Sequence, residues 1–272
     1  MIKRSGKKAL RLTTIAGAIL IIFLICALLA PWLAPYDPGK ADFAQRLAAP
    51  SLAHPFGCDL LGRDLLSRVL YGAQTVFLTA ITAVALSCIV GSLLGLAAGY
   101  YGGVIDAVIM RFTEAIMAVP PLILAMGISI VMEQNRKNLM LALAFSSLPT
   151  FIRIIRGQVK AIRHLPFIQS SRIIGCSESR ILFKHIFPNC VIPVIVAVTS
   201  SLGSVILAEA SLSYLGVGIP SEIPAWGSMV SEGFQYLDIS PRLAIIPGLA
   251  IVMTVSAFSI IGDRLGDVIR LK

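Results

Sequence analysis

The chain has 272 residues, of which 57% are hydrophobic and 14% charged, and its mean hydropathy is +0.87. Soluble globular proteins have about 45–50% apolar and about 25% charged residues, so the composition excludes that class and indicates a protein of the lipid bilayer. The net charge of +9 would suit nucleic acid. The basic residues cluster at the ends of apolar runs, however, as the positive-inside rule expects, and we expect no nucleic-acid partner. The five cysteines are an odd number in or beside apolar stretches, so they imply no disulfide framework.

The first expected membrane span follows a basic N-terminal segment. A spanning helix needs about 20 mostly apolar residues, and residues 13–34 carry no charge. Residues 1–12 before it show no signal-peptide cleavage pattern, so we expect a retained first helix. Prolines at and beyond its end stop this helix, and residues 35–74 are polar enough to form an extracytoplasmic segment.

The second span, near residues 75–99, contains a stripe of small residues. They recur every four positions and are Ala83, Ser87, Gly91, Gly95 and Gly99. In lipid, small residues let two helix backbones approach closely. The stripe therefore predicts a helix-packing surface rather than a ligand site.

The third span, about residues 104–132, contains Pro120 and Pro121, which must kink or break it. The uncharged run of the fourth span, residues 139–152, is too short to cross a bilayer by itself. The span must include Arg153 and Arg156 at its end, with side chains that snorkel to the membrane surface.

The fifth and sixth spans are residues 190–208 and 243–262, followed by a short polar tail, residues 263–272. Residues 75–262 thus form a five-helix core. Six spans place both termini on one side. Most of the 23 lysines and arginines lie on that side, so we expect both termini and the polar insert between the fourth and fifth spans to be cytoplasmic.

That insert, residues 167–188, reads FIQSSRIIGCSESRILFKHIFP and is basic. It predicts two short helical stretches, 167–174 and 178–187, separated by a turn at Gly175, with Pro188 marking the start of the fifth span. Such a helix across the cytoplasmic face suits docking to a soluble ATP-driven motor. The alternative is an amphipathic helix that binds anionic lipid. Its small size and its glycine favour a protein partner.

The chain lacks the common catalytic motifs, namely GxxxxGK(S/T), HExxH, GxSxG and CxxC. We therefore expect neither an enzyme nor a nucleotide site. His54, Cys58 and Asp59 could be drawn as a metal site, but no fourth ligand is at hand, and a turn with a capping acid is favoured. An ion-coupled carrier needs an ionisable group inside its spans. Only Glu209 is a candidate, and it lies at the end of its apolar run.

The insert resembles the EAA loop of bacterial ABC importer permeases. Gln169, Ser170 and Ser171 stand at the EAA positions, Gly175 at the glycine, and Ile186-Phe187-Pro188 at the end of the motif. Gln169 keeps the length of the usual glutamate but not its charge.

A second resemblance covers nearly the whole chain. Residues 54–74 (HPFGCDLLGRDLLSRVLYGAQ), 207–220, 225–227 and 261–265 are similar to the C-type subunit of the dipeptide, oligopeptide and nickel permease subfamily, with Cys58 where threonine is usual. The signature positions are Gly57, Asp59, Gly62, Arg63, Asp64, Glu209, Trp226 and Gly227.

The resemblance implies an all-α protein with six transmembrane helices in the type I ABC importer permease fold, with a cytoplasmic coupling helix, in the bacterial cytoplasmic (inner) membrane. It implies a second homologous permease subunit, two cytoplasmic ATPase subunits that bind ATP and Mg, and an extracytoplasmic solute-binding protein, with no cofactor in this chain. The expected coupling residues are Gln169, Ser170, Ser171, Arg172, Gly175, Arg180, Lys184 and Pro188.

Several functions stay open from the sequence. Peptides are the favoured cargo because the peptide members of the subfamily are the more numerous. A nickel or metallophore importer is the alternative, although no path rich in histidine or cysteine is evident. A stand-alone secondary carrier would depend on an acid inside the membrane, and a non-transporting scaffold would leave the coupling insert without a role.

Overall fold

The computed structural model describes residues 2–270, with side chains for residues 11–267. Over this range the secondary structure is helical, and no β-strand is present. The elements are α1 (Ile2–Leu28), α2 (Ala30–Leu33), η1 (Phe43–Gln45), α3 (Leu65–Tyr101), α4 (Gly103–Met117), α5 (Pro121–Val131), α6 (Arg136–Ile162), α7 (Pro166–Ile173), α8 (Glu178–Arg180), η2 (Ile181–Ile186), α9 (Phe187–Tyr214), α10 (Trp226–Phe234) and α11 (Arg242–Arg270). Five described helices are long and apolar enough to cross a membrane, or six if the bent pair α4–α5 is one span. The expected all-α membrane fold is confirmed.

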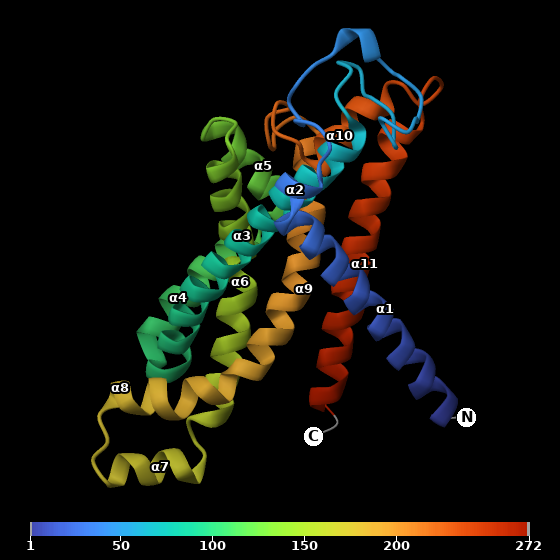
Figure 1. Ribbon diagram of the computed structural model, residues 1–272. Coiled ribbons are helices and arrows are strands. Elements are labelled where there is room, and N and C mark those ends of the chain that lie inside the picture. Colours follow the sequence, from blue (N-terminus) through green and yellow to red (C-terminus); the bar gives the residue numbers. More distant parts are fainter. Residues whose placement is uncertain (1, 271–272) are drawn as a thin grey trace.

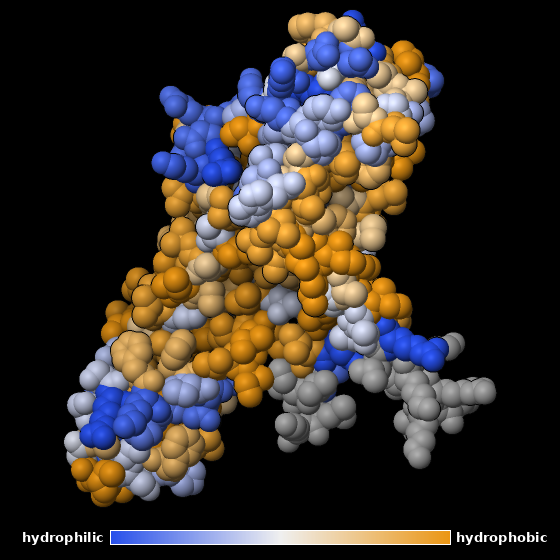
Figure 2. All heavy atoms as spheres, in the orientation of Figure 1, coloured by the Kyte–Doolittle hydropathy of each residue, from blue (hydrophilic) through white to orange (hydrophobic). Residues whose placement is uncertain are grey.

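The long helices form a tilted bundle with polar structure at both ends. The start of α1, the end of α11 and α7 lie at one end, and α10 lies at the other end with the loops around residues 35–64 (Figure 1). Figure 2 shows a broad apolar belt between these two polar ends. A belt of this kind matches the hydrocarbon region of a bilayer.

The helices are longer than the uncharged runs that predicted them. Helix α3 begins at Leu65, not near residue 75, because the Asp64 carboxylate caps it by accepting the Ser67 N–H at 2.8 Å. Residues 65–74 of the expected extracytoplasmic segment 35–74 thus belong to the first turns of α3. Helix α11 likewise continues through the expected polar tail, to Arg270. Side chains before residue 11 and after residue 267 lie outside the described residues.

Prolines end the first span earlier than expected and break the third span, as the sequence predicted. The first ends at Leu28, and α2, with Pro31 near its start, forms a separate turn where the span was expected to continue to residue 34. The third is split into α4 and α5, which meet at an angle of 86°. Pro121 lies in the first turn of α5, where its missing N–H costs no hydrogen bond.

Two apolar clusters hold the bundle together. The larger joins α3, α6, α9, α10 and α11 along the membrane span. The smaller lies at the α7 end, where Leu96 and Tyr100 of α3 meet Ile155 and Val159 of α6 and Ile168 of α7. The second cluster attaches the polar insert to the spans.

Candidate functional site

The coupling segment, residues 167–188, forms a helical hairpin at one end of the bundle. Helix α7 ends at Ile173, and Gly175 turns the chain with a φ of +79°, a left-handed conformation that glycine adopts without strain. The second half of the hairpin runs through the π-helical turn η2 directly into α9, which begins at Phe187, next to the Pro188 that the sequence predicted as the start of the fifth span. The Phe187 N–H bonds to the Leu182 carbonyl five residues back. The wider π turn keeps the chain helical just before a residue that has no N–H to donate.

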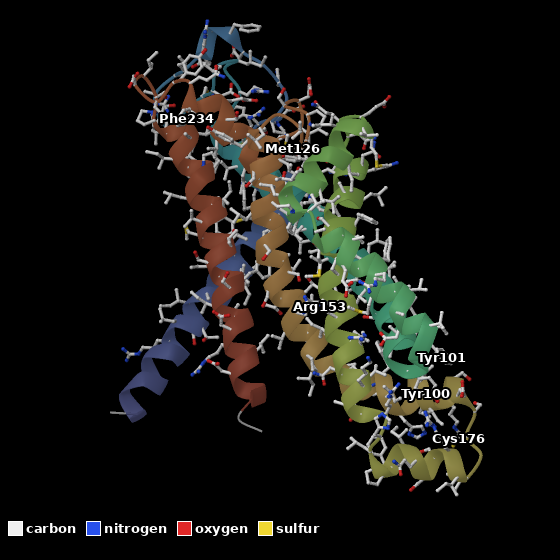
Figure 3. The ribbon with its side chains drawn as sticks, turned by 180° about the vertical axis from the view of Figure 1, so that it is seen from behind. Tyr100, Tyr101, Met126, Arg153, Cys176 and Phe234 are labelled. Carbon is white, nitrogen blue, oxygen red and sulfur yellow. The ribbon has the colours of Figure 1, made fainter. Side chains whose placement is uncertain are left out.

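One face of α7 is fixed to the bundle. Ile168 is fully buried in the smaller cluster, and Ser171 is 8% exposed, with its hydroxyl donating to the Phe167 carbonyl at 2.8 Å. The Arg172 guanidinium lies 5.3 Å from the centre of the Tyr100 ring, within cation–π range. Figure 3 shows Tyr100 at the end of α3, close to this hairpin and to Cys176. These contacts join α7 to the ends of α3 and α6.

The opposite face of the hairpin exposes apolar side chains that the sequence interpretation missed. Ile173 is 86% exposed, Ile174 is 78% exposed, and Phe183 is 57% exposed. All three lie at the end of the molecule where Figure 2 shows polar atoms around apolar ones. The signal in the sequence was the Ile-Ile pair directly before the turn glycine. Whether these isoleucines point into the bundle or away from it depends on which face of α7 is buried.

The other expected coupling residues have differing surroundings. Gln169 is turned back on its own chain, with Nε2 donating to the His164 carbonyl at 3.1 Å. Ser170, Arg180, Lys184 and Pro188 are exposed. Within the described residues the Arg180 and Lys184 side chains have no hydrogen bond or ion pair, so both charges are free to meet a partner.

The stripe on α3 packs against α6. A Cβ atom added at Gly91 would lie 2.6 Å from the Phe151 Cβ, one at Gly95 would lie 2.8 Å from the Ile152 carbonyl oxygen, and one at Gly99 would lie 2.7 Å from the Val159 Cβ. The helices are thus too close for any side chain at these positions. Ser87 donates across the contact to the Ala144 carbonyl at 2.6 Å.

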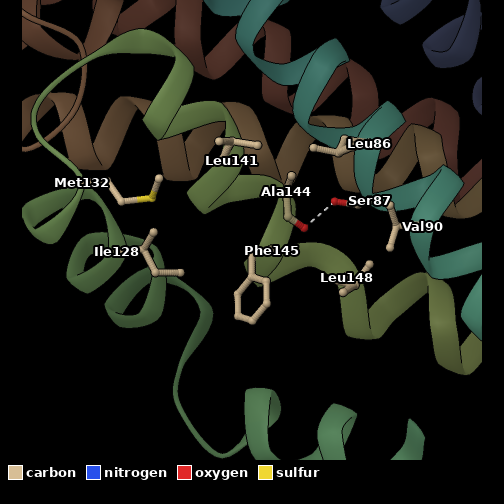
Figure 4. Close-up of a pocket in the computed structure, with 9 residues that line it drawn as sticks. All are labelled: Leu86, Ser87, Val90, Ile128, Met132, Leu141, Ala144, Phe145 and Leu148. Carbon is tan, nitrogen blue, oxygen red and sulfur yellow. Dashed lines mark hydrogen bonds between the residues drawn. The ribbon is translucent and has the colours of Figure 1, made fainter.

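An apolar pocket of about 480 Å³ opens beside this contact, between α3, α5 and α6 (Figure 4). Ser87 is its one polar side chain, and the hydroxyl is already bonded to Ala144. The pocket thus offers no polar contact to a ligand.

A charged cluster joins α4 to α6 near the α7 end. The Arg156 guanidinium donates two hydrogen bonds to Asp106, and the Lys160 ammonium lies 2.7 Å from the same carboxylate. The sequence predicted that Arg156 snorkels to the membrane surface, and the structure pairs its guanidinium with Asp106 of α4. Arg153 lies within α6, which continues to Ile162.

The signature residues near the first loop form a second charged cluster, at the α10 end. The Asp59 carboxylate accepts the Leu61 and Arg63 N–H groups at 2.9 Å and the Arg63 Nε at 2.6 Å. Arg63 also donates to Glu232 of α10 at 3.1 Å, and Arg68 lies 3.5 Å from Asp59. Burial is the main cause that raises the pKa of Glu232, and the two arginines oppose it. The sequence interpretation missed Arg68 and Glu232, because neither lies in a recognisable local pattern.

His54, Cys58 and Asp59, which were considered as a metal site, have other partners. His54 Nδ1 is bonded to Asp64 at 2.9 Å and its ring stacks on Tyr36. Cys58 is fully buried, and burial together with the nearby acids Asp64 and Asp59 raises the pKa of its thiol. No group of three histidine, cysteine, aspartate or glutamate side chains in the described part of the chain could hold a metal ion. The three residues belong to the turn before α3, and the acid that caps this helix is a different residue, Asp64.

The remaining signature residues fix the ends of α9 and α10. Glu209 is fully buried and accepts a hydrogen bond from Ser213 at 2.8 Å. Trp226 is fully buried and donates to the Val69 carbonyl at 3.0 Å. A Cβ atom at Gly227 would lie 2.2 Å from the Ala210 carbonyl oxygen. These contacts hold α3, α9 and α10 together at the α10 end.

The chain is similar to membrane subunits of binding-protein-dependent transporters. Residues 91–272 match the family model described as "Binding-protein-dependent transport system inner membrane component". Residues 10–50 match "N-terminal TM domain of oligopeptide transport permease C". The two matched ranges lie on either side of the signature residues 54–74.

Curated relatives resemble the chain over most of its length. A "Probable D,D-dipeptide transport system permease protein" of Escherichia coli is 36% identical, with 96% of this chain and 88% of that protein covered. A "Glutathione transport system permease protein" of Pectobacterium atrosepticum is 37% identical, with 94% of this chain and 86% of that protein covered.

The fold has a counterpart among solved structures. The methionine ABC transporter MetNI in an inward-facing conformation matches with a TM-score of 0.58 at 18% sequence identity, with 74% of this chain and 95% of that chain covered. At this identity the likeness concerns the fold alone. Together with the family models and the relatives, it shows that this chain belongs to the family of inner membrane permease components of binding-protein-dependent ABC transport systems.

Proposed function

We propose that the chain is a permease subunit of an ATP-driven ABC importer of peptides and forms half of the translocation path. The observation that carries the cargo assignment is the similarity, over more than nine tenths of the chain, to permeases named for D,D-dipeptide and glutathione transport. This favours peptides over nickel or a metallophore. A stand-alone secondary carrier is disfavoured because the family works with a binding protein.

In the proposed assembly a second homologous permease lies beside this chain in the bacterial cytoplasmic membrane. Two ATPase subunits, which bind ATP and Mg, contact the coupling segment, so the α7 end and both termini face the cytoplasm. The bias of basic residues supports this orientation. A solute-binding protein delivers peptide at the α10 end.

The contact with an ATPase is best carried by the exposed isoleucines. Interfaces have an apolar centre inside a polar rim, and a few buried anchors supply most of the binding energy. Ile173 and Ile174 provide such a centre, and Arg180 and Lys184 provide the rim. The buried Ile168 and the Arg172–Tyr100 contact would then transmit movement into the spans.

The test is to replace both isoleucines by serine in the complete importer. Ile173→Ser with Ile174→Ser should weaken association with the ATPase subunits at least about tenfold, since the loss of an anchor typically costs about 2 kcal/mol or more. Co-purification with the ATPases and ATP-driven uptake are measured together. Val131→Ser is the matched control, because Val131 is 84% exposed at the far end of α5. Normal association in the double variant would contradict the docking proposal.

A further inference from the structure

A groove lined by hydroxyl groups runs between α6 and α9, next to the start of α5. It is open, has a volume of about 750 Å³ and contains no charged side chain among the residues that line it. The polar side chains in its wall are Ser146, Ser147, Thr150, Gln158, Ser200, Ser201 and Ser204. The neighbouring pocket of Figure 4 has one polar side chain, so this groove differs from an ordinary lipid-facing surface.

Several of these groups have no partner within the chain. The Ser147, Thr150, Gln158 and Ser201 side chains make no hydrogen bond within the described residues, in contrast to Thr79 of α3, whose hydroxyl donates to the Thr75 carbonyl at 2.8 Å. A polar group that is neither bonded nor in bulk water costs free energy. The wall therefore suits a guest that supplies donors and acceptors.

Arg153 lies where this groove continues along α6. A second hollow of about 530 Å³ shares Pro121, Ser146, Thr150 and Ile154 with the groove and is also lined by Arg153. Thr150, Arg153 and Ile154 follow Ser146 at helical spacing, so they share a face of α6. Figure 3 shows Arg153 between Met126 of α5 and the Tyr100–Tyr101 end of α3, which is within the length of the spans.

Arg153 has no acidic partner within the described residues. Its one polar contact there is the Met117 sulfur at 3.6 Å, a weak acceptor. The next three bases along the chain all have partners. Arg156 and Lys160 bind Asp106, and Arg163, which follows the end of α6, donates to the Gly99 carbonyl at 2.9 Å. An unpaired charge inside a membrane span is costly and marks a pathway or a ligand site.

We propose that Arg153 binds the carboxylate of a peptide during its passage, while the hydroxyl groups of the groove bond to the peptide backbone. The inference rests on the proposed peptide function and adds the site and the recognised group. A guanidinium fork matches a carboxylate in two parallel hydrogen bonds. Serine and threonine hydroxyls both donate and accept, so they serve amide groups of any sequence. The groove therefore recognises what all linear peptides share.

Two other partners for Arg153 are distinguishable from a peptide. An acid on the second permease would make Arg153 an interface residue, and a lipid phosphate would make it an anchor. Neither calls for the unbonded hydroxyls that line the adjoining groove. Neither would respond to the chemistry of the peptide terminus.

The test uses the whole importer in proteoliposomes with its solute-binding protein, and the probes are tri-alanine and tri-alanine amide. Arg153→Gln should slow uptake of tri-alanine about tenfold and leave uptake of the amide unchanged. Arg153→Lys should keep most of the tri-alanine uptake because it retains the charge. Arg111→Gln is the control, since Arg111 is highly exposed and paired with Glu114 on its own helix.

Equal slowing of both probes by Arg153→Gln, or no slowing of either, would overturn the carboxylate site. Dissociation of the two permeases in that variant would overturn it too and assign Arg153 to their interface. If the wild-type importer takes up tri-alanine but not the amide, the test is the comparison of Arg153→Lys with Arg153→Gln. Uptake of tri-alanine that falls equally in both variants would contradict the proposal. If the wild type takes up neither probe, the peptide function fails first, and the inference fails with it.

Discussion

The two polar ends of the molecule use charge in opposite ways. At the α10 end, Asp59, Arg63, Arg68 and Glu232 lie within ion-pair distance of one another, and the two arginines are 7% and 1% exposed. In the coupling segment Arg180 and Lys184 are exposed and unpaired within the described residues, beside Ile173 and Ile174. The first arrangement stabilises the fold. The second leaves charged and apolar side chains exposed without a partner among the described residues.

The difference shows that a charged motif does not by itself mark a docking site. A buried cluster of ion pairs is costly to break, because the remaining partner is left without compensation. Exposed charges contribute little to folding and are available to a partner. We therefore interpret the signature around Asp59 as mainly structural, and we propose the coupling segment as the surface that binds another protein.

Two glycines with the same backbone conformation give the largest expected contrast. Gly62 has a φ of +74° and Gly175 a φ of +79°, but a Cβ atom at Gly62 would lie 1.7 Å from the Asp42 carbonyl oxygen, whereas Gly175 has no atom within 4 Å. Both alanine variants incur about 1–2 kcal/mol for the left-handed conformation. Gly62→Ala adds a clash with backbone and should cost about 4 kcal/mol or more. Thermal unfolding of the purified chain in detergent measures both, and equal losses would show that the loop at the α10 end is not tightly fixed.

Two arginines provide the next contrast. Arg63→Met leaves Asp59 and Glu232 underpaired and should destabilise the fold by about 2–3 kcal/mol, below the range for fully buried pairs because the Glu232 side chain is 27% exposed. Arg180→Met should change stability by less than about 0.5 kcal/mol.

The loss in Arg63→Met should also depend on pH. The pKa of Glu232 is already raised, chiefly by burial, and removal of Arg63 removes one of the charges that lower it. The ionised carboxylate is the penalised form in the folded state, so the deficit is largest at neutral pH and shrinks as the pH falls and Glu232 binds a proton. A deficit that grows on acidification would contradict this account.

Two cysteines give the smallest contrast, in labelling rate rather than stability. Cys58 is fully buried and its pKa is raised, first by burial, so little thiolate forms at neutral pH. Cys176 in the coupling segment is partly exposed. A maleimide should label Cys176 in the folded protein and Cys58 only after denaturation, as followed by peptide mass spectrometry. Rapid native labelling of Cys58 would mean that the loop opens.

The sequence by itself determined the features that depend on neighbours along the chain. Uncharged runs predict the spans, prolines predict the break between α4 and α5, and the four-residue repeat of Ser87, Gly91, Gly95 and Gly99 predicts a packing surface. The motif residues also led to the correct family. These signals are local, because hydropathy and helical spacing are read over one helix at a time.

Only the tertiary structure decided which charges are paired and which side chains are exposed. Arg63 and Glu232 are 169 positions apart, and Arg153 and Arg156 differ only because Asp106 of α4 lies beside the second. Ile168 and Ile173 are the same residue type on one helix, yet the first is buried and the second 86% exposed. The physical reason is that pairing and burial depend on which distant helix lies alongside, and a linear pattern does not contain that information.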